Sequence, residues 1–363
     1  MYFDYDEDQN EFRAVLRQLF TQHASIERVR AIAETGRIDR ELWAVLCTEM
    51  AAPALHLSED VGGAGFTLVE TSILAQELGR TLAPVPLIAT SVVTEAIIQL
   101  GTTQQVEAEL GSILAGERIA TAPMVALTNA STLAQVNADG TLSGSFDFIP
   151  HIADADVVLI GAALRDGGTG VYLVDPTDAG VTLDAGESLD TTRAGAPVRF
   201  ESTRGVLLGN AQASPDRLAR IDAIGRTLLA ADLVGAAREA LHGAVEYAKI
   251  RRQFNRQIGS FQGVKHLCSD ASIAIELAHP VTDWAAMSYG TADFATHSVL
   301  AKYEASEALT LAAGNSIQVH GGMGFTWEAT PHLYFRRATA AAQAYGDANA
   351  NLLAIYQAAA QAA

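Results

Sequence analysis

Apolar residues recur at three- and four-residue spacing along the first third of the chain, which predicts amphipathic helices. The repeat is clear over 38–50, and a further helix is predicted over 68–78, with Gly79 where a glycine commonly ends a helix. A glycine cluster at 62–65 interrupts the pattern, and because no phosphate-loop lysine follows it, it predicts a turn. Residues 1–120 are therefore expected to form a helical domain.

The pattern then changes to short apolar runs separated by turn residues, which predicts strands. Asn137–Gly140 has the composition of a hairpin turn. Several strands at this spacing indicate a compact antiparallel sheet or barrel over 121–213. The strand-like runs are Val157–Ile160, Val171–Val174 and Val198–Phe200.

A second helical region follows from Ser214, which can cap a helix whose first positions are Pro215 and Asp216. This first helix is predicted to run to about Arg252. Residues 214–363 are therefore expected to form an all-helical bundle, and the three domains together make a mostly α, α+β protein. The further predicted helices are 263–290, 292–317 and 331–361.

Composition narrows the class of protein. Hydrophobic residues make up 49% of the 363 residues and charged residues only 18%, which indicates either extra surface buried between subunits or an unusually alanine-rich interior. The net charge of −18 excludes a nucleic-acid partner, because no basic patch is available to displace counterions. Cys47 and Cys268 have no metal or redox spacing. The acidic N-terminus and the absence of an apolar run of membrane length predict a soluble, cytoplasmic protein.

Two segments carry candidate binding chemistry. The first, 251–262, offers a guanidinium, an aromatic face and an amide, and the second, 318–325, places an amide beside two glycines. A guanidinium suits a pyrophosphate, and glycines allow a ligand to approach the backbone. Together the segments could hold a large, planar, doubly phosphorylated molecule. Taken singly, each could instead be a solvated helix end or a turn.

At these residues the chain resembles the acyl-CoA dehydrogenase family, in its R-x-x-F-x-x-x-I-x-x-F-Q and Q-x-x-G-G-x-G-F segments, which bind FAD. The resemblance implies a helical domain, a small β-barrel and a four-helix bundle. It implies that one group of residues grips the FAD of a neighbouring subunit and that a second group holds the adenosine diphosphate portion. The first group is Arg251, Phe254 and Gln262, and the second is Gln318, Gly321 and Gly322.

The family segments that contact the flavin ring are altered. Where family members usually carry a T-E-P-x-x-G-S-D-like segment, this chain has 122–129, which lacks the acid-proline-glycine-serine order. Where they carry a W-I-T-like segment, it has 146–151, without the tryptophan. The chain is expected to keep the half-site that it lends to a partner and to have lost much of its own.

The usual catalytic glutamate is also missing. One family position for it corresponds to Tyr345 and the other to Gly225. A phenol with an ordinary pKa near 10 is a poor base. Asp232 and Asp347 lie nearby, but aspartate is one methylene shorter and small misplacements cost large factors in rate. Both remain weak candidates for a base, with structural roles as the alternative.

Arg226 corresponds to an arginine that lies beside the acyl-CoA in the family, although Ala223 replaces the aspartate common three residues earlier. The resemblance implies the non-catalytic subunit of a heteromeric, FAD-dependent acyl-CoA dehydrogenase, with an α2β2 assembly and a catalytic partner subunit. Its substrate would be an acyl-CoA, including bulky or steroid side-chain esters, and its acceptor an electron-transfer flavoprotein or similar. The alternatives are a homomeric dehydrogenase using Asp232 or Asp347, and a scaffold that has lost flavin.

Overall fold

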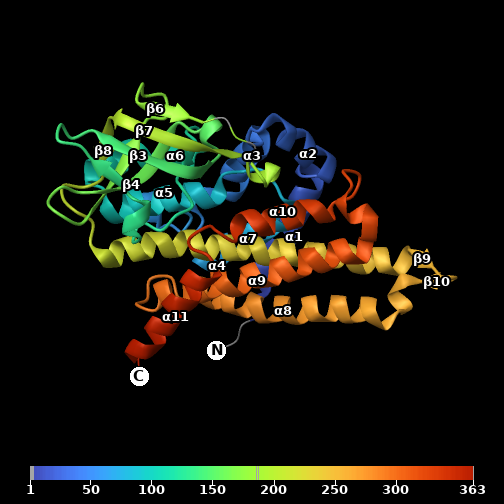
Figure 1. Cartoon of the computed structure of the whole chain (residues 1–363). Helices are drawn as coiled ribbons and strands as arrows, with labels where there is room; N and C mark the ends of the chain where they lie inside the picture. The colour runs from blue at the N-terminus through green and yellow to red at the C-terminus, as the bar shows by residue number, and fades with distance from the viewer. Residues whose placement is uncertain (1–3, 185, 187, 363) are drawn as a thin grey trace.

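The computed structural model describes residues 4–184, 186 and 188–362. Helices, then a sheet, then a bundle of long helices follow one another along the chain, in the predicted order (Figure 1). Within these described ranges, none of the helices combines the length and apolar character needed to cross a bilayer.

Six helices and two short 3₁₀ turns form the N-terminal part from residue 4 onward. Their starts are fixed locally, because α1 and α4 both begin with a capping box, Asp6 with Gln9 and Thr67 with Glu70. Gly62 and Gly65 adopt positive φ after the second 3₁₀ turn, which is the predicted turn. The elements are α1 (Glu7–His23), α2 (Ile26–Thr35), α3 (Arg40–Met50), η1 (Ala52–Ala54), η2 (Glu59–Val61), α4 (Leu68–Thr81), α5 (Leu87–Leu100) and α6 (Thr103–Leu114).

In the middle part, the described residues form a curled sheet of eight strands. Its successive neighbours are β6, β7, β3, β2, β4, β5 and β8, and β1 pairs with β4. The predicted turn at 137–140 joins β2 to β3. Strand β2 pairs with β3 on one side and with β4 on the other, and its pairing with β4 is parallel. The sheet is therefore mixed, and the prediction of an antiparallel sheet is wrong in this respect. The elements are β1 (Ala120–Thr121), η3 (Ala130–Thr132), β2 (Ala134–Val136), β3 (Leu142–Pro150), η4 (Ile152–Asp154), β4 (Val157–Ala163), β5 (Thr169–Val174), β6 (Val181–Leu183), η5 (Thr191–Arg193), β7 (Gly195–Thr203) and β8 (Gly205–Leu207).

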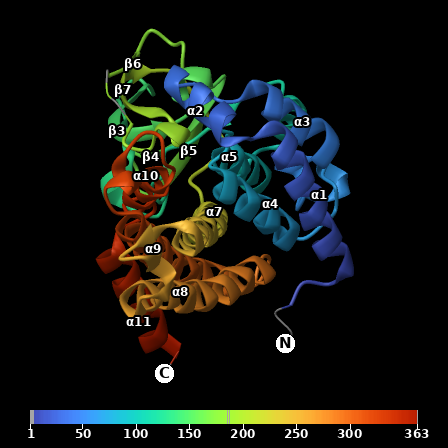
Figure 2. The same ribbon diagram turned by 90° about the vertical axis from the view of Figure 1, so that its right-hand side faces the viewer.

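The C-terminal part is built around α7, which packs against α4 and α5 on one side and α8 and α9 on the other (Figure 2). Ser214 caps α7 as predicted, accepting a hydrogen bond from the Arg217 amide. The elements are α7 (Pro215–Ile250), β9 (Arg252–Gln253), β10 (Arg256–Gln257), η6 (Ile258–Ser260), α8 (Gln262–Met287), α9 (Phe294–His320), η7 (Gly321–Phe325), α10 (Pro331–Ala341) and α11 (Ala348–Ala362).

The prediction of a single helix over 331–361 is wrong. The chain breaks between α10 and α11, where Tyr345 and Gly346 have φ of 53° and 97°. Buried Lys302 of α9 stabilises the break, because its Nζ donates to the Ala342 and Gly346 carbonyls at 3.0 and 2.7 Å. Apolar periodicity continues through the break and therefore does not reveal it.

Gly79 does not end α4 as predicted but lies inside it. A Cβ at Gly79 would overlap the Asp232 backbone of α7, and a Cβ at Gly235 would overlap the Gln76 backbone of α4. These two glycines let the helix backbones touch where α4 crosses α7. Gly79 therefore serves helix packing, which outweighs its helix-ending preference.

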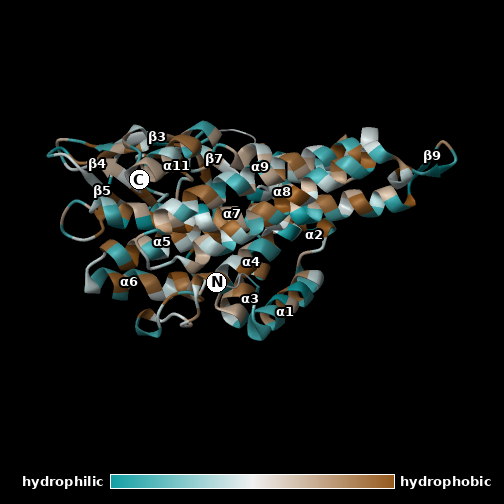
Figure 3. Ribbon diagram, turned by 90° about the horizontal axis from the view of Figure 1, so that it is seen from below, coloured by the Kyte–Doolittle hydropathy of each residue, from teal (hydrophilic) through white to brown (hydrophobic). Residues whose placement is uncertain are grey.

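Hydrophobic and hydrophilic residues alternate along the ribbon of the outer helices (Figure 3), and several of the hydrophobic ones are exposed. Large exposed apolar surfaces commonly mark contacts with other proteins. On α8 and α11 these residues are Ile273, Leu277, Met287, Leu352, Leu353 and Tyr356.

A buried polar network joins the N-terminal segment to the bundle. Tyr5 Oη donates to Asp283 Oδ1 at 2.7 Å, and Gln76 of α4 also contacts Asp283. Burial, with nearby Arg238 and Arg13 adding to it, lowers the pKa of His279 to about 3. The 3.2 Å contact between His279 Nε2 and Asp283 Oδ2 is therefore not an ion pair at neutral pH.

Burial raises the pKa of Asp283 from 3.8 to about 6, opposed by Tyr5, Arg13, Arg238 and Gln76. A raised pKa in the folded state contributes stability below about pH 4, and that contribution is lost as pH rises through about 6. The shift corresponds to roughly 2–3 kcal/mol. We expect Asp283→Asn to raise the urea midpoint at neutral pH, because the new amide can donate to His279.

The matched control is Asp270→Asn, an exposed acid on the same helix. Urea midpoints measured between about pH 5 and about pH 8 should show a weaker pH dependence for Asp283→Asn alone. A lower midpoint for Asp283→Asn at every pH would contradict the assignment.

Candidate functional site

The two predicted cofactor-binding segments meet at one end of the bundle. The C-terminus of α7 and the N-terminus of α8 flank the β9–β10 hairpin, which projects beyond the helices (Figure 1). The C-terminus of α9 packs beside them, where Asn315 Nδ2 donates to the Leu267 carbonyl at 2.9 Å and Val319 packs with Ala244 and Ala248. We call this end the bundle tip, consisting of Arg251, Phe254, Gln262, Gln318, Gly321 and Gly322.

The polar and aromatic side chains of the bundle tip are exposed. Phe254 is 86% exposed, and with Asn255 it occupies a hairpin turn at φ of 51° and 60°. An aromatic residue in the left-handed region is uncommon, and here the turn presents its ring to the outside. The Arg251 guanidinium forms no ion pair within the described part of the chain. The tip therefore offers a charged donor group and an aromatic surface to another molecule.

The glycine turn of the bundle tip is open. Gly321 has φ 62° and ψ −140°, a conformation that only glycine adopts readily. A Cβ at Gly321 or Gly322 would meet no atom within 4 Å. A ligand can therefore approach this backbone closely, and together with the exposed guanidinium, ring and amides the tip fits a planar, phosphate-bearing cofactor.

The two positions where the base is expected lie in contact with each other. A Cβ at Gly225 of α7 would overlap the phenol of Tyr345, so one side chain fills both positions. Tyr345 is 4% exposed, and burial beside Asp222 raises the pKa of its phenol far above the usual value. Its backbone N–H donates to the Met124 carbonyl at 2.9 Å. A neutral, buried phenol cannot serve as a base at neutral pH.

Asp222 holds the altered segment 122–129 against α7. Its carboxylate accepts from the Leu127 and Thr128 amides at 2.7 and 3.1 Å and from Thr128 Oγ1 at 2.7 Å. Two backbone N–H groups of this segment therefore donate within the chain and are not available to a ligand. Arg226 also faces inward, with Nη2 4.0 Å from Asp222. The structure thus places Arg226 beside an internal carboxylate.

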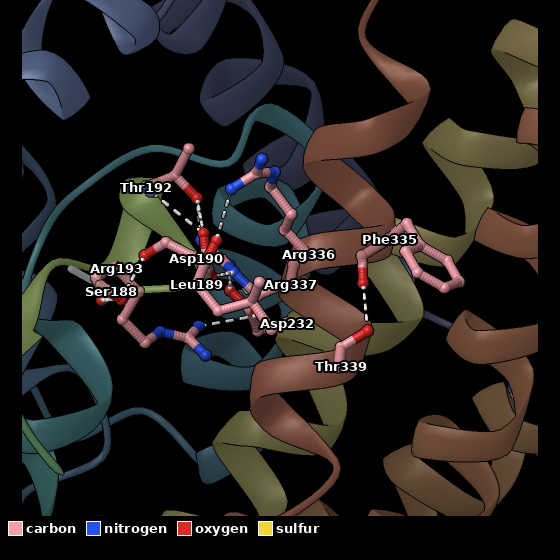
Figure 4. Close-up of polar contacts among 10 residues, drawn as sticks. All are labelled: Ser188, Leu189, Asp190, Thr192, Arg193, Asp232, Phe335, Arg336, Arg337 and Thr339. Atoms are coloured by element: carbon pink, nitrogen blue, oxygen red, sulfur yellow. Dashed lines mark hydrogen bonds and ion pairs between the residues drawn. The ribbon is translucent and has the colours of Figure 1, made fainter. Parts of the chain in front are cut away.

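Asp232 belongs to a buried ion-pair cluster formed by Asp190, Arg193, Asp232 and Arg337 (Figure 4). Both its oxygens bind Arg337 Nη1, at 2.8 and 2.9 Å, and Oδ2 also contacts Arg193 Nη2 at 2.9 Å. Arg337 Nε also donates to Asp190. Burial opposes ionisation of Asp190, but Arg337 and Arg193 lower its pKa. Asp232 is thus engaged as a counter-ion between three parts of the fold.

Asp347 lies on the surface at the start of α11. Its Oδ1 accepts from the Ala350 amide at 2.8 Å, which is the contact of a helix N-cap. Neither candidate aspartate is free, because one binds two arginines and the other caps a helix. We infer structural roles for both.

Of the cavities within the described residues, two bear on the site. The narrow cavity has a volume of about 20 Å³ and is lined by His151, Arg193, Asp232, Arg337 and Tyr345 among others. That volume holds about one water molecule and no acyl chain. Burial lowers the pKa of His151 to about 3, so it too is uncharged.

The wide cavity has a volume of about 580 Å³ and opens between the sheet and α10. Met124 and Arg193 line both cavities and so stand between them. The two altered segments both reach the wide cavity, through Val125 and through Phe146–Phe148. The cavity beside the sheet thus remains, while the space beside Tyr345 is closed.

Sequence reasoning missed two features. Tyr247, one turn before Arg251, stacks on His320 with ring centroids 4.3 Å apart and joins the two segments of the bundle tip. Tyr247 could have been found from the sequence, because it lies four residues before Arg251, one helical turn, and so on the same helix face. The ion-pair cluster could not be found from the sequence, because its residues come from separate parts of the chain and form no local motif.

Known proteins match nearly the whole chain. The model of the acyl-CoA dehydrogenase N-terminal domain matches residues 6–117, and that of the C-terminal domain matches residues 222–360. Acyl-CoA dehydrogenase IpdE2 of Mycobacterium tuberculosis is 36% identical over 93% of this chain and 92% of its own length.

Solved structures show the same fold. The Tcur3481-Tcur3483 steroid ACAD G363A variant superposes with a TM-score of 0.87 at 30% identity, covering 98% of both chains. The ChsE4-ChsE5 complex of Mycobacterium tuberculosis gives 0.88 at 24% identity over 99% of both. The FAD complex of PigA gives 0.86 at 18% identity, covering 100% of both chains.

Proposed function

Since this chain belongs to the acyl-CoA dehydrogenase family, we propose that it is the non-catalytic subunit of a heteromeric FAD-dependent acyl-CoA dehydrogenase. It lends the bundle tip to the FAD of a catalytic partner subunit, with an α2β2 assembly. One observation carries this proposal: the bundle tip is exposed and open, whereas the narrow cavity is closed.

The reaction is the α,β-desaturation of an acyl-CoA thioester. A base must remove the α-proton, and FAD, when bound, would supply the acceptor for the β-hydride. In this chain Arg251 would bind the pyrophosphate, Phe254 would cover an aromatic face of the cofactor, and Gln262 and Gln318 would hydrogen-bond its polar edges. The base then has to come from the partner subunit.

The closed narrow cavity supports assigning the acyl site to the partner. Tyr345 fills the place of the base, and its N–H is bound to the Met124 carbonyl, so this amide is not available to a substrate oxygen. Arg226 is largely buried and faces Asp222, with Nη2 4.0 Å from Oδ2, so it points into the chain and not toward a CoA on the surface.

Several observations favour a partner and a bulky substrate. Exposed apolar residues on α8 and α11 suit contact with another subunit. The 30%-identical structure is that of a steroid ACAD with the double name Tcur3481-Tcur3483, which supports a heteromer acting on bulky or steroid side-chain CoA esters. The electrons would pass to an electron-transfer flavoprotein or a similar acceptor.

We expect the chain expressed alone to be flavin-poor and its complex with a catalytic partner to hold about one FAD per heterodimer. The reason is that the tip supplies only half of a cofactor site. Flavin absorbance relative to protein mass, measured on both preparations, provides the test. Full flavin occupancy with turnover in a homo-oligomer would favour the homomeric alternative, and no flavin in any combination would favour a scaffold.

Asp347→Asn in the assembled complex should leave turnover within a few-fold of the parent, because asparagine also caps helices. Loss of a true base would lower turnover by a factor on the order of 10² to 10⁴. Steady-state kinetics at unchanged FAD content measure the difference. A large loss would return Asp347 to the role of base.

A further inference from the structure

The wide cavity has the size and the lining of a small-molecule site. Its volume of about 580 Å³ falls within the range of such sites, and its apolar lining includes Met124, Phe146, Phe148 and Leu189. Phe146 packs edge-on against Phe200 of β7, with ring centroids 5.8 Å apart, which fixes its ring in this wall. The cavity therefore suits a ligand that presents apolar ring faces to it.

Several polar groups of the lining already have partners within the chain. Ser188 Oγ donates to the Asp190 carbonyl at 2.8 Å, and Thr132 Oγ1 donates to a backbone carbonyl at 2.9 Å. The Asp190 carboxylate accepts hydrogen bonds from the Thr192 amide at 3.0 Å and from Arg337 Nε. These groups therefore contribute little to binding a ligand. Other polar residues of the described lining are exposed and so lie toward the mouth: Ser131, Ser145, Asp147 and Gln343.

Arg193 differs from these groups because part of its guanidinium has no partner. Its Nη2 pairs with Asp232 Oδ2 at 2.9 Å (Figure 4). Nε and Nη1 form no hydrogen bond with the described residues, and 12% of the side chain stays exposed where it lines the cavities. A guanidinium carries five N–H donors in a fixed plane and no acceptor. The inner part of the wide cavity therefore offers N–H donors to an oxygen of the ligand.

The charges around Arg193 favour a neutral acceptor over an anion. In the ion-pair cluster two guanidiniums, of Arg193 and Arg337, face two carboxylates, of Asp190 and Asp232, so the formal charges balance. Asp147 adds a negative charge toward the mouth. A carboxylate on the ligand would have to be desolvated without a cation of its own, which is costly. A carbonyl oxygen needs only the hydrogen bond.

We propose that the wide cavity binds a neutral, apolar ring compound whose carbonyl oxygen accepts a hydrogen bond from Arg193. The site shares no residue with the bundle tip. It therefore goes beyond the proposed function and does not depend on it. Because an isoalloxazine ring is also flat and carries carbonyl oxygens, the test has to separate a ring ketone from a flavin.

The test titrates the full-length chain with prodan, a neutral naphthyl ketone whose fluorescence reports the polarity around it. Three unlabelled compounds compete with prodan for the site. Acetonaphthone is a second naphthyl ketone, naphthoate has the same ring with a carboxylate, and lumiflavin is the flavin ring without phosphates. The comparison of acetonaphthone with naphthoate changes only the group that faces Arg193.

Three variants locate the binding. Ala340→Trp places an indole in the cavity from an exposed position on α10, and Thr339→Trp, at the neighbouring exposed position outside the lining, is its control. Arg193→Lys keeps a positive charge for Asp232 but lacks the flat edge of donors. Urea midpoints establish that each variant is folded.

We expect Ala340→Trp to abolish saturable prodan binding, because the indole takes the place of the ligand, and Thr339→Trp to retain it. Arg193→Lys should weaken prodan binding by roughly five- to tenfold, the effect of one lost hydrogen bond. Acetonaphthone should displace prodan at a roughly tenfold lower concentration than naphthoate, because only the anion has to be desolvated without a cation. This comparison decides the matter if Arg193→Lys does not fold.

Four outcomes would overturn the proposal. Binding that survives Ala340→Trp lies elsewhere, for example on the exposed apolar residues of α8 and α11. Unchanged binding in a folded Arg193→Lys removes the assigned donor. Displacement by naphthoate as strong as that by acetonaphthone indicates an anion site, and stronger displacement by lumiflavin indicates a flavin pocket. FAD binding at the bundle tip is measured separately with Arg251→Ala, so the failure of either idea leaves the other standing.

Discussion

Arg337→Met is expected to lower the free energy of unfolding by about 3–5 kcal/mol, because removing one partner of a buried ion pair leaves uncompensated charge. Arg337 is 2% exposed and binds Asp190 and Asp232 together. Without it, two buried carboxylates would share Arg193 alone. Arg337 Nη2 also donates to Thr192 Oγ1 at 2.8 Å, a bond that methionine cannot replace.

The matched control is Arg199→Met, because the side chains of Arg199 and its partner Asp184, 3.2 Å apart, are each about half exposed. Such surface pairs contribute about 1 kcal/mol or less. Urea midpoints of the assembled complex compare the two variants. Equal small shifts would mean that the buried cluster is not what holds the sheet to the bundle.

The variant Asp232→Asn tests whether Asp232 acts as the catalytic base or as a structural counter-ion. It should also lower the urea midpoint, because it removes a charge facing two guanidiniums, but turnover per folded, FAD-loaded complex should stay within a few-fold. A base would show the opposite pattern, with a loss on the order of 10² to 10⁴ in turnover. Stability and turnover measured on the same preparation therefore separate the two roles of Asp232.

Arg251→Ala is expected to weaken FAD binding in the assembled complex on the order of 30- to 100-fold, because it removes a charge-assisted contact to the pyrophosphate. Arg251 follows α7 directly and forms no ion pair within the described ranges, so its loss should not disturb the fold. Fluorescence titration with FAD measures the effect.

Arg252→Ala is the matched control, since the neighbouring Arg252 is also exposed but donates to the Asn255 carbonyl within its own hairpin. We expect this variant to retain FAD affinity within a few-fold. If Arg251→Ala retains affinity in a folded, assembled complex, Arg251 is only a surface charge and the assignment of the bundle tip loses its main donor.

Much of the fold could be predicted from local pattern. Helix periodicity located the main helices, and the Ser214-Pro215 start and the turn at 137–140 were both confirmed. These features depend on interactions within a few residues, which a sequence displays directly. The bundle tip could likewise be located from two motifs, although its geometry could not.

What could not be predicted depends on contacts between distant segments. Gly79 has the local signature of a helix end, yet its contact with Asp232 of α7 keeps it inside α4. The break at Tyr345 depends on Lys302, which lies on another helix. The partners of Asp232 are Arg193 and Arg337, so its role became visible only when the sheet and α10 were placed against α7.

The crossing of α4 and α7 explains how such a chain can change its chemistry without losing its architecture. At Gly79 and Gly235 the two helices contact each other through their main chains. The distance between the helices therefore does not depend on the size of any side chain at this contact. Substitutions around Gly225 and Tyr345 therefore alter the contents of the site while the two helices keep their distance. On such a support, side chains of the site can be exchanged one at a time in evolution, and a laboratory that wishes to place a carboxylate there has the same freedom.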